Sequence, residues 1–103
     1  MGFGTILGMH NLRAFLFKFK ENLPQKSGVK IESHESRSNS KLKSQGFNPG
    51  LTYLKITKDE KVIFEIDAAD DEGYSAEGDA DLKKAVDSEN MDQALDLYSR
   101  LVE

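Results

Sequence analysis

The sequence contains no cysteine, and this absence removes several kinds of chemistry at once. Disulfide bonds, thiolate catalysis and cysteine-based zinc sites are excluded, because each of them needs a thiol. No apolar run approaches the roughly 20 residues that span a bilayer, so we expect no membrane segment. The N-terminal stretch lacks the basic region and the clear cleavage site of a signal peptide, and a cytoplasmic protein is therefore the expectation.

Histidine is almost as scarce, since the chain holds only His10 and His34. Neither a Gly-x-Ser-x-Gly elbow nor a Walker-type phosphate loop accompanies them. His34 lies between Glu32 and Glu35, and on an extended strand only Glu32 would share its face. A surface histidine beside carboxylates is in most proteins no more than that. We therefore predict a non-enzymatic protein that needs no cofactor.

Charge is distributed unevenly along the 103 residues, although the net charge is only −4. Residues 1–61 carry eleven Lys or Arg against five Asp or Glu, whereas residues 62–103 carry three against thirteen. Such asymmetry indicates a charged partner, or two faces of the protein that attract each other. At this length we predict a single domain that covers residues 1–103.

Apolar periodicity predicts a helix over residues 11–23. The apolar positions follow i, i+3, i+4, i+7 and i+11 and lie on one helical stripe: Leu12, Phe15, Leu16, Phe19 and Leu23. Asn11 is the expected N-cap and Pro24 the expected stop. A strand is the competing interpretation, because Phe15, Phe17 and Phe19 alternate, but only the helix also explains Leu12 and Leu23. Phe17 is then expected on the polar side, and residues 2–7 are expected to form a short strand or a loose end.

Two further segments alternate in the manner of strands. Residues 29–36 place Val29 and Ile31 between charged residues, which predicts an edge strand. Residues 51–67 predict a β-hairpin that turns at 58–61. Tyr53 and Ile63 are expected on its second face, and its buried face is expected to contain Leu54, Ile56, Val62, Phe64 and Ile66.

The C-terminal segment 79–103 predicts a helical hairpin, with Asp79 capping its first helix. Together these elements predict an α+β fold. A small antiparallel sheet around the 51–67 hairpin packs against an N-terminal helix (11–23) and the C-terminal helical hairpin (79–103). An antiparallel sheet of this kind can leave its other face in water.

The Ser-rich segment 36–50 is basic and free of acidic residues after Glu35, and we expect a mobile loop there. Its cations could contact phosphates, which makes a nucleic-acid-associated protein the alternative function; the residues concerned are Arg37, Lys41 and Lys43. A flexible loop that only improves solubility is the simpler interpretation.

The segment 65–82 holds eight carboxylates and no Lys, Arg or His. An EF-hand loop has an oxygen ligand at position 1, Gly at position 6 and a bidentate Glu at position 12. Aligning Gly73 with position 6 places Ala68 at position 1 and Asp79 at position 12, so both key ligands are lost. A divalent-cation-responsive module of another kind stays an alternative, and it would draw on Asp67, Asp70, Asp71 and Asp79. We predict no metal in the protein.

Protein recognition is the leading hypothesis for this segment. Carboxylates surround Tyr74, and a patch of one sign accelerates association with a basic partner. The predicted contact residues are Asp67, Asp70, Asp71, Glu72, Tyr74, Glu77, Asp79 and Asp81. We expect a small acidic protein-binding domain, an inhibitor or immunity-type factor whose segment 65–81 occludes a basic surface, for example on a nucleic-acid-acting enzyme. The competing interpretation is a patch that pairs with the chain's own basic half or stays hydrated.

Overall fold

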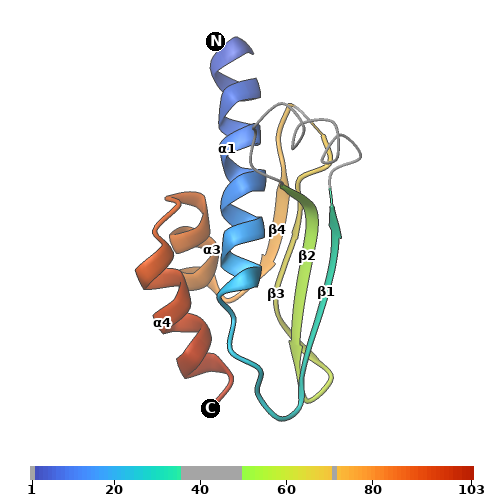
Figure 1. Cartoon of the computed structure of the whole chain (residues 1–103), viewed down its shortest axis with the longest axis vertical. Helices are drawn as coiled ribbons and strands as arrows, with labels where there is room; N and C mark the ends of the chain where they lie inside the picture. Colours follow the sequence, from blue (N-terminus) through green and yellow to red (C-terminus); the bar gives the residue numbers. More distant parts are fainter. Residues whose placement is uncertain (1, 36–49, 71) are drawn as a thin grey trace.

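The computed structural model describes residues 2–35, 50–70 and 72–103, with residues 2–10 described by their backbone alone. The elements are α1 (Gly2–Glu21), β1 (Val29–Glu35), β2 (Leu51–Lys58), β3 (Lys61–Asp67), β4 (Ser75–Gly78), α3 (Ala80–Asp87) and α4 (Met91–Leu101). The strands form an antiparallel sheet in the order β1-β2-β3-β4, and the helices lie against one of its faces (Figure 1). The predicted α+β fold is therefore confirmed.

The helix α1 begins earlier than its periodicity predicts. The backbone is helical from Gly2, so Asn11 lies inside the helix and the predictions of an N-cap at Asn11 and of a non-helical 2–7 segment are wrong. Glycines at positions 2, 4 and 8 weaken the helix signal there, yet extending an existing helix adds one hydrogen bond per residue and needs no new nucleus. Phe17 was expected on the polar side, but it is half-buried and packs against the core.

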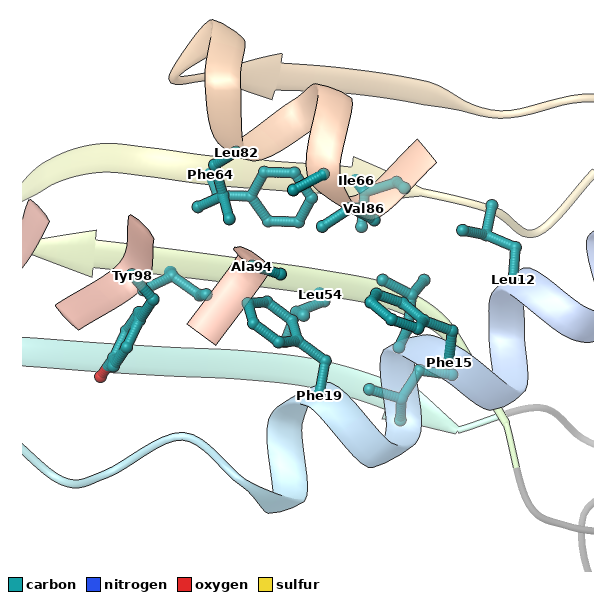
Figure 2. Packing of buried hydrophobic residues seen from close by; sticks show 14 of the residues in the cluster. Leu12, Phe15, Phe19, Leu54, Phe64, Ile66, Leu82, Val86, Ala94 and Tyr98 are labelled. Atoms are coloured by element: carbon teal, nitrogen blue, oxygen red, sulfur yellow. The ribbon is translucent and has the colours of Figure 1, made fainter. Parts of the chain in front are cut away.

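The core fills the space between the helices and the sheet. Figure 2 shows apolar side chains of α1 facing those of the sheet, α3 and α4; the labelled residues are Leu12, Phe15, Phe19, Leu54, Phe64, Ile66, Leu82, Val86, Ala94 and Tyr98. Full burial of a Val, Leu, Ile or Phe side chain contributes roughly 1.5–3 kcal/mol. The hydroxyl of Tyr98 donates to the Pro24 carbonyl at 2.9 Å, which ties α4 to the segment that follows α1.

The hairpin of β2 and β3 turns through Asp59 and Glu60, whose φ angles are 52° and 70°. Left-handed conformations at both positions match the twist of the flanking strands. Val62 was expected in the buried face, but it is 43% exposed. The register shifts between Ile56 and Thr57, so Val62 leaves the row of core residues. Ile63, expected on the second face, is half-buried against the core.

The strand β4 has no counterpart in the sequence prediction, because Ala, Glu and Gly favour strands weakly. Its structure comes from pairing with β3, in which Ala76 lies opposite Ile66 and Gly78 opposite Phe64. Gly78 has a φ of 117°, and a Cβ at this position would collide with the Ile63 carbonyl. The chain can leave β4 and enter α3 in this way only with glycine.

The helical hairpin follows directly. Asp79 caps α3 as predicted, since its carboxylate accepts a hydrogen bond from the Leu82 N–H at 3.0 Å. Asn90 caps α4 by accepting from the Gln93 N–H at 3.1 Å. These two caps satisfy backbone donors at the helix starts.

Candidate functional site

The face of the sheet that is turned away from the helices, here called the outer face, is mainly polar, although the exposed Val62 lies opposite Thr57 on it. Strand alternation places on it Lys30, Glu32 and His34 of β1, Tyr53, Lys55 and Thr57 of β2, Glu65 and Asp67 of β3, and Ser75 and Glu77 of β4. The basic residues lie on β1 and β2, whereas β3 and β4 contribute only carboxylates among their charged residues there. The outer face is therefore most acidic at its β3–β4 side.

Five of these residues, here called the acidic face, line a hollow of about 180 Å³: Tyr53, Glu65, Asp67, Ser75 and Glu77. Glu65 lies directly opposite Glu77, and Asp67 lies opposite Ser75 in the next row. Like charges directly opposite each other destabilise a sheet by roughly 0.2–1 kcal/mol. Within the described part of the chain, the ion pairs are Lys30–Glu32 at 3.4 Å and Asp96–Arg100 at 3.0 Å, and neither involves these carboxylates.

The carboxylate of Glu65 is held by a neighbouring tyrosine. The Tyr53 hydroxyl donates to Glu65 Oε2 at 2.6 Å, and the rings of Tyr53 and His34 lie 5.4 Å apart. The hydrogen bond to Glu65, followed by burial and by nearby negative charge, raises the pKa of Tyr53 from 10.0 to about 12. Tyr53 is therefore a hydrogen-bond donor well beyond neutral pH, and its hydroxyl holds the carboxylate of Glu65 in place.

Residues 68–70 and 72–74, here called the acidic loop, continue this surface. Asp67 Oδ1 accepts from the Ala69 N–H at 3.1 Å, and Asp70 Oδ1 accepts from the Glu72 N–H at 2.8 Å. The loop borders a hollow of about 590 Å³ whose lining also includes Asp67 and Ser75. Because both hollows share these two residues, the acidic face and the acidic loop form one continuous surface.

Contacts with the rest of the fold hold both ends of the acidic loop. At its start, the buried Arg13 donates through Nε to the Ala68 carbonyl at 2.7 Å, and the Ala68 N–H donates to the Thr52 carbonyl at 2.8 Å. At its end, the Tyr74 hydroxyl donates to Asp87 Oδ1 on α3. Burial and this hydrogen bond raise the pKa of Tyr74 to about 12. The loop is thus positioned by α1, β2 and α3.

The structure divides the predicted contact residues into groups. Asp67 and Glu77 lie on the acidic face, and three others lie on the acidic loop: Asp70, Glu72 and Tyr74. Asp79 is half-buried and serves as the cap of α3, while Asp81 is exposed in the first turn, where a negative charge suits the helix dipole. Four predicted residues lie outside the described part of the chain: Asp71 and the phosphate-binding candidates Arg37, Lys41 and Lys43.

The arrangement of the described residues does not support the alternative of a cation site. Among residues 11–35, 50–70 and 72–103, whose side chains the structure describes, no group of three or more His, Asp or Glu could hold a metal ion. Of the four carboxylates considered for such a site, Asp79 caps a helix and Asp71 is not among the described residues.

The acidic face also includes Tyr53, which lies outside the predicted contact segment, and Glu65 and Ser75, which lie within segment 65–81 but were not among the predicted contact residues. Strand alternation could have placed Tyr53 and Glu65 on one face of the hairpin. Residues two apart on a strand point to the same face, and Tyr53 is two residues from Lys55 just as Glu65 is two residues from Asp67. Ser75 joins them only through the pairing of β4 with β3, for which the sequence has no signal.

Comparison with known protein families, with curated proteins and with solved structures finds no match for this chain. In the described residues, no helix is both long enough and apolar enough to cross a membrane. The function is therefore inferred from the geometry and the charge of the site.

Proposed function

We propose that the protein binds a basic surface of a protein partner through the acidic face and the acidic loop, and that it does so without catalysis. The observation that carries the proposal is the placement of Glu65 opposite Glu77, with Asp67 in the adjacent row. This arrangement costs folding free energy, and a lysine or arginine side chain of a partner would offset the repulsion.

Pairing with the chain's own basic residues is the competing interpretation. Lys55 is the nearest basic residue in register, because it lies opposite Glu65 on β2. No ion pair joins them in the described part of the chain, where Glu65 instead accepts its hydrogen bond from Tyr53. The charge of the acidic face is therefore available to a partner.

The size of the surface also bears on the proposal. Strands about 4.8 Å apart with a rise of about 3.3 Å per residue give the outer face a footprint of roughly 20 by 25 Å. The acidic face occupies only part of this footprint, whereas a stable interface takes roughly 800 Å² of accessible surface from each partner. We therefore include the acidic loop in the contact surface, since its hollow continues that of the acidic face.

A surface of this kind suits a protein that occludes a basic site on another protein, as inhibitors and immunity-type factors do. Clustered carboxylates accelerate encounter with a basic partner, and Tyr53 and Tyr74 supply side chains of a type enriched in binding hot spots. A cytoplasmic location is part of the same proposal.

The test compares two variants that remove the same charge from different places. The first changes the acidic face by Glu65→Gln, Asp67→Asn and Glu77→Gln, which keeps an acceptor oxygen for the Tyr53 and Ala69 donors. The control changes exposed carboxylates at the C-terminus: Asp92→Asn, Asp96→Asn and Glu103→Gln. The measurement is the affinity of each protein for a deca-lysine peptide by titration calorimetry at low salt.

We expect the acidic-face variant to lose about tenfold in affinity, because three exposed charge interactions are worth roughly 0.2–1 kcal/mol each. The control should lose far less. Equal losses in the two variants would show that net charge alone attracts the peptide, and would contradict the proposal. As a further arm, Glu77→Lys should raise the free energy of unfolding by roughly 0.2–1 kcal/mol while it lowers the affinity.

A further inference from the structure

The strand β1 lies at an edge of the sheet. Within the described part of the chain it pairs with β2 on one side and with no strand on the other. It is seven residues long and contains no proline, and its register is regular up to His34. An edge of this length and regularity offers backbone donors and acceptors to another strand. The opposite edge strand, β4, has only four residues. Pairing of two β4 strands would bring Glu77 of one copy close to Glu77 of the other.

The hydrogen bonds of β1 identify which backbone groups point outward. The Gly28 carbonyl accepts from the Asp59 N–H at 2.9 Å, and the carbonyls of Lys30 and His34 accept from threonine hydroxyls of β2 at 3.4 Å. The even-numbered residues of β1 therefore direct their backbone groups toward β2. Because this direction alternates along a strand, the odd-numbered residues direct theirs away from the sheet.

The outward backbone groups belong to Val29, Ile31 and Ser33. The Val29 N–H is occupied by the Lys26 carbonyl at 3.2 Å, which leaves its carbonyl for an incoming strand. Ile31 is only half-buried and packs at the margin of the core, so a neighbouring strand would cover it further. The edge thus combines free backbone groups with an apolar side chain that is not fully covered.

We propose that the protein forms a dimer in which the β1 strands of two copies pair antiparallel with Ile31 opposite Ile31. In this register Lys30 of each copy lies opposite Glu32 of the other, so two ion pairs form on the outer face. A register centred on residue 30 or on residue 32 would instead bring Lys30 against Lys30 or Glu32 against Glu32. The charges of β1 are therefore self-complementary in the proposed register. Lys30 and Glu32 form an ion pair within one strand at 3.4 Å, and in the dimer each would pair with the other residue of the second copy instead.

The dimer contains a continuous sheet of eight strands, four from each copy. Because the symmetry axis is perpendicular to the sheet, both acidic faces point to the same side. The proposal does not rest on the proposed function, since β1 and β4 lie at opposite edges of the sheet.

The first test reverses the charges of Lys30 and Glu32, singly and together. The dissociation constant of the dimer is measured by sedimentation velocity at protein concentrations up to millimolar. Lys30→Glu and Glu32→Lys should each weaken the dimer by about tenfold or more, because two attractive pairs become repulsive. The double variant should restore the wild-type dissociation constant. A wild-type protein that stays monomeric, or a double variant that is as weak as the single ones, would overturn the proposal.

The second test acts on the backbone. Ser33→Pro removes an outward N–H without removing a bond of the β1–β2 ladder, so the variant should be monomeric with an unchanged circular dichroism spectrum. Ser33→Ala is the matched control and should dimerise as the wild type does. A folded Ser33→Pro protein that still dimerises would exclude β1 as the interface, and the charge-reversal result decides the matter if the proline variant fails to fold.

Discussion

At the scale of single residues, the tyrosines share one chemical arrangement. The hydroxyl of Tyr53 donates to Glu65, that of Tyr74 to Asp87, and that of Tyr98 to the Pro24 carbonyl. The carboxylate partners and burial raise the pKa of Tyr53 and Tyr74 to about 12, and burial raises the pKa of Tyr98 as well. Deprotonating any of them would place a phenolate beside an acceptor that can no longer be satisfied.

This arrangement predicts how the folded protein responds to alkaline pH. A folded-state pKa above the unfolded value of about 10 means that the protonated tyrosines contribute stability below about pH 10. Tyr53 and Tyr74 lose this contribution as the pH rises through about 12, and Tyr98 loses it as the pH rises above its unfolded pKa. The measurement is phenolate absorbance against pH for the native chain and for the chain unfolded in urea. We expect the native titration to lie entirely above that of the unfolded chain.

Circular dichroism at each pH verifies that the native sample is still folded. A native component that titrates near pH 10 would contradict the hydrogen bonds assigned to the tyrosine hydroxyls. Tyr53→Phe should remove one of the late-titrating groups and leave the other two in place.

At the scale of elements, the periodicity of apolar residues predicts those helices and strands whose conformation follows from their local sequence. The stripe from Leu12 to Phe19 and the alternation of Leu54 and Ile56 follow the periods of a helix and a strand, and both segments fold accordingly. The start of α1 and the position of Val62 could not be predicted in this way. The first depends on helix propagation through glycines, and the second depends on a register shift between two strands.

The candidate site was only partly predictable for the same reason. Composition alone identifies the carboxylates of 65–82, but it does not tell which of them share a surface. Glu65 and Glu77 become neighbours only because β4 pairs with β3, while Asp79 is drawn into a helix cap. Both outcomes depend on tertiary contacts, which local sequence patterns do not encode.

The strand β4 also gives a prediction at this scale. Gly78→Ala should lower the free energy of unfolding by at least about 2 kcal/mol, because a φ of 117° is strained for alanine and the new Cβ meets the Ile63 backbone. Gly73→Ala is the matched control, since a Cβ at Gly73 has no heavy atom within 4 Å. Urea unfolding of both variants provides the measurement. Equal stability of the two proteins would contradict the assigned geometry of β4.

At the scale of the whole molecule, the fold gives the sheet two different faces. One face of the sheet is covered by α1, α3 and α4 and holds the core (Figure 1). The other face exposes charged side chains and carries its basic residues on β1 and β2 and most of its carboxylates on β3 and β4. The proposed contact with a basic partner uses the acidic side, whereas the proposed dimer uses the edge at β1. A dimer would therefore present two acidic faces together and could bind a repeated or extended basic surface more tightly.

The most direct test of the account is the location of the surface that binds a basic ligand. The measurement is the change in amide chemical shifts of the full chain when deca-lysine peptide is added. We predict the largest changes at residues 65–70 and 72–77, and their reversal at high salt as screening shortens the Debye length to about 3 Å near 1 M. Largest changes on α4, around Asp92 and Asp96, or changes of similar size over the whole surface would contradict the central claim.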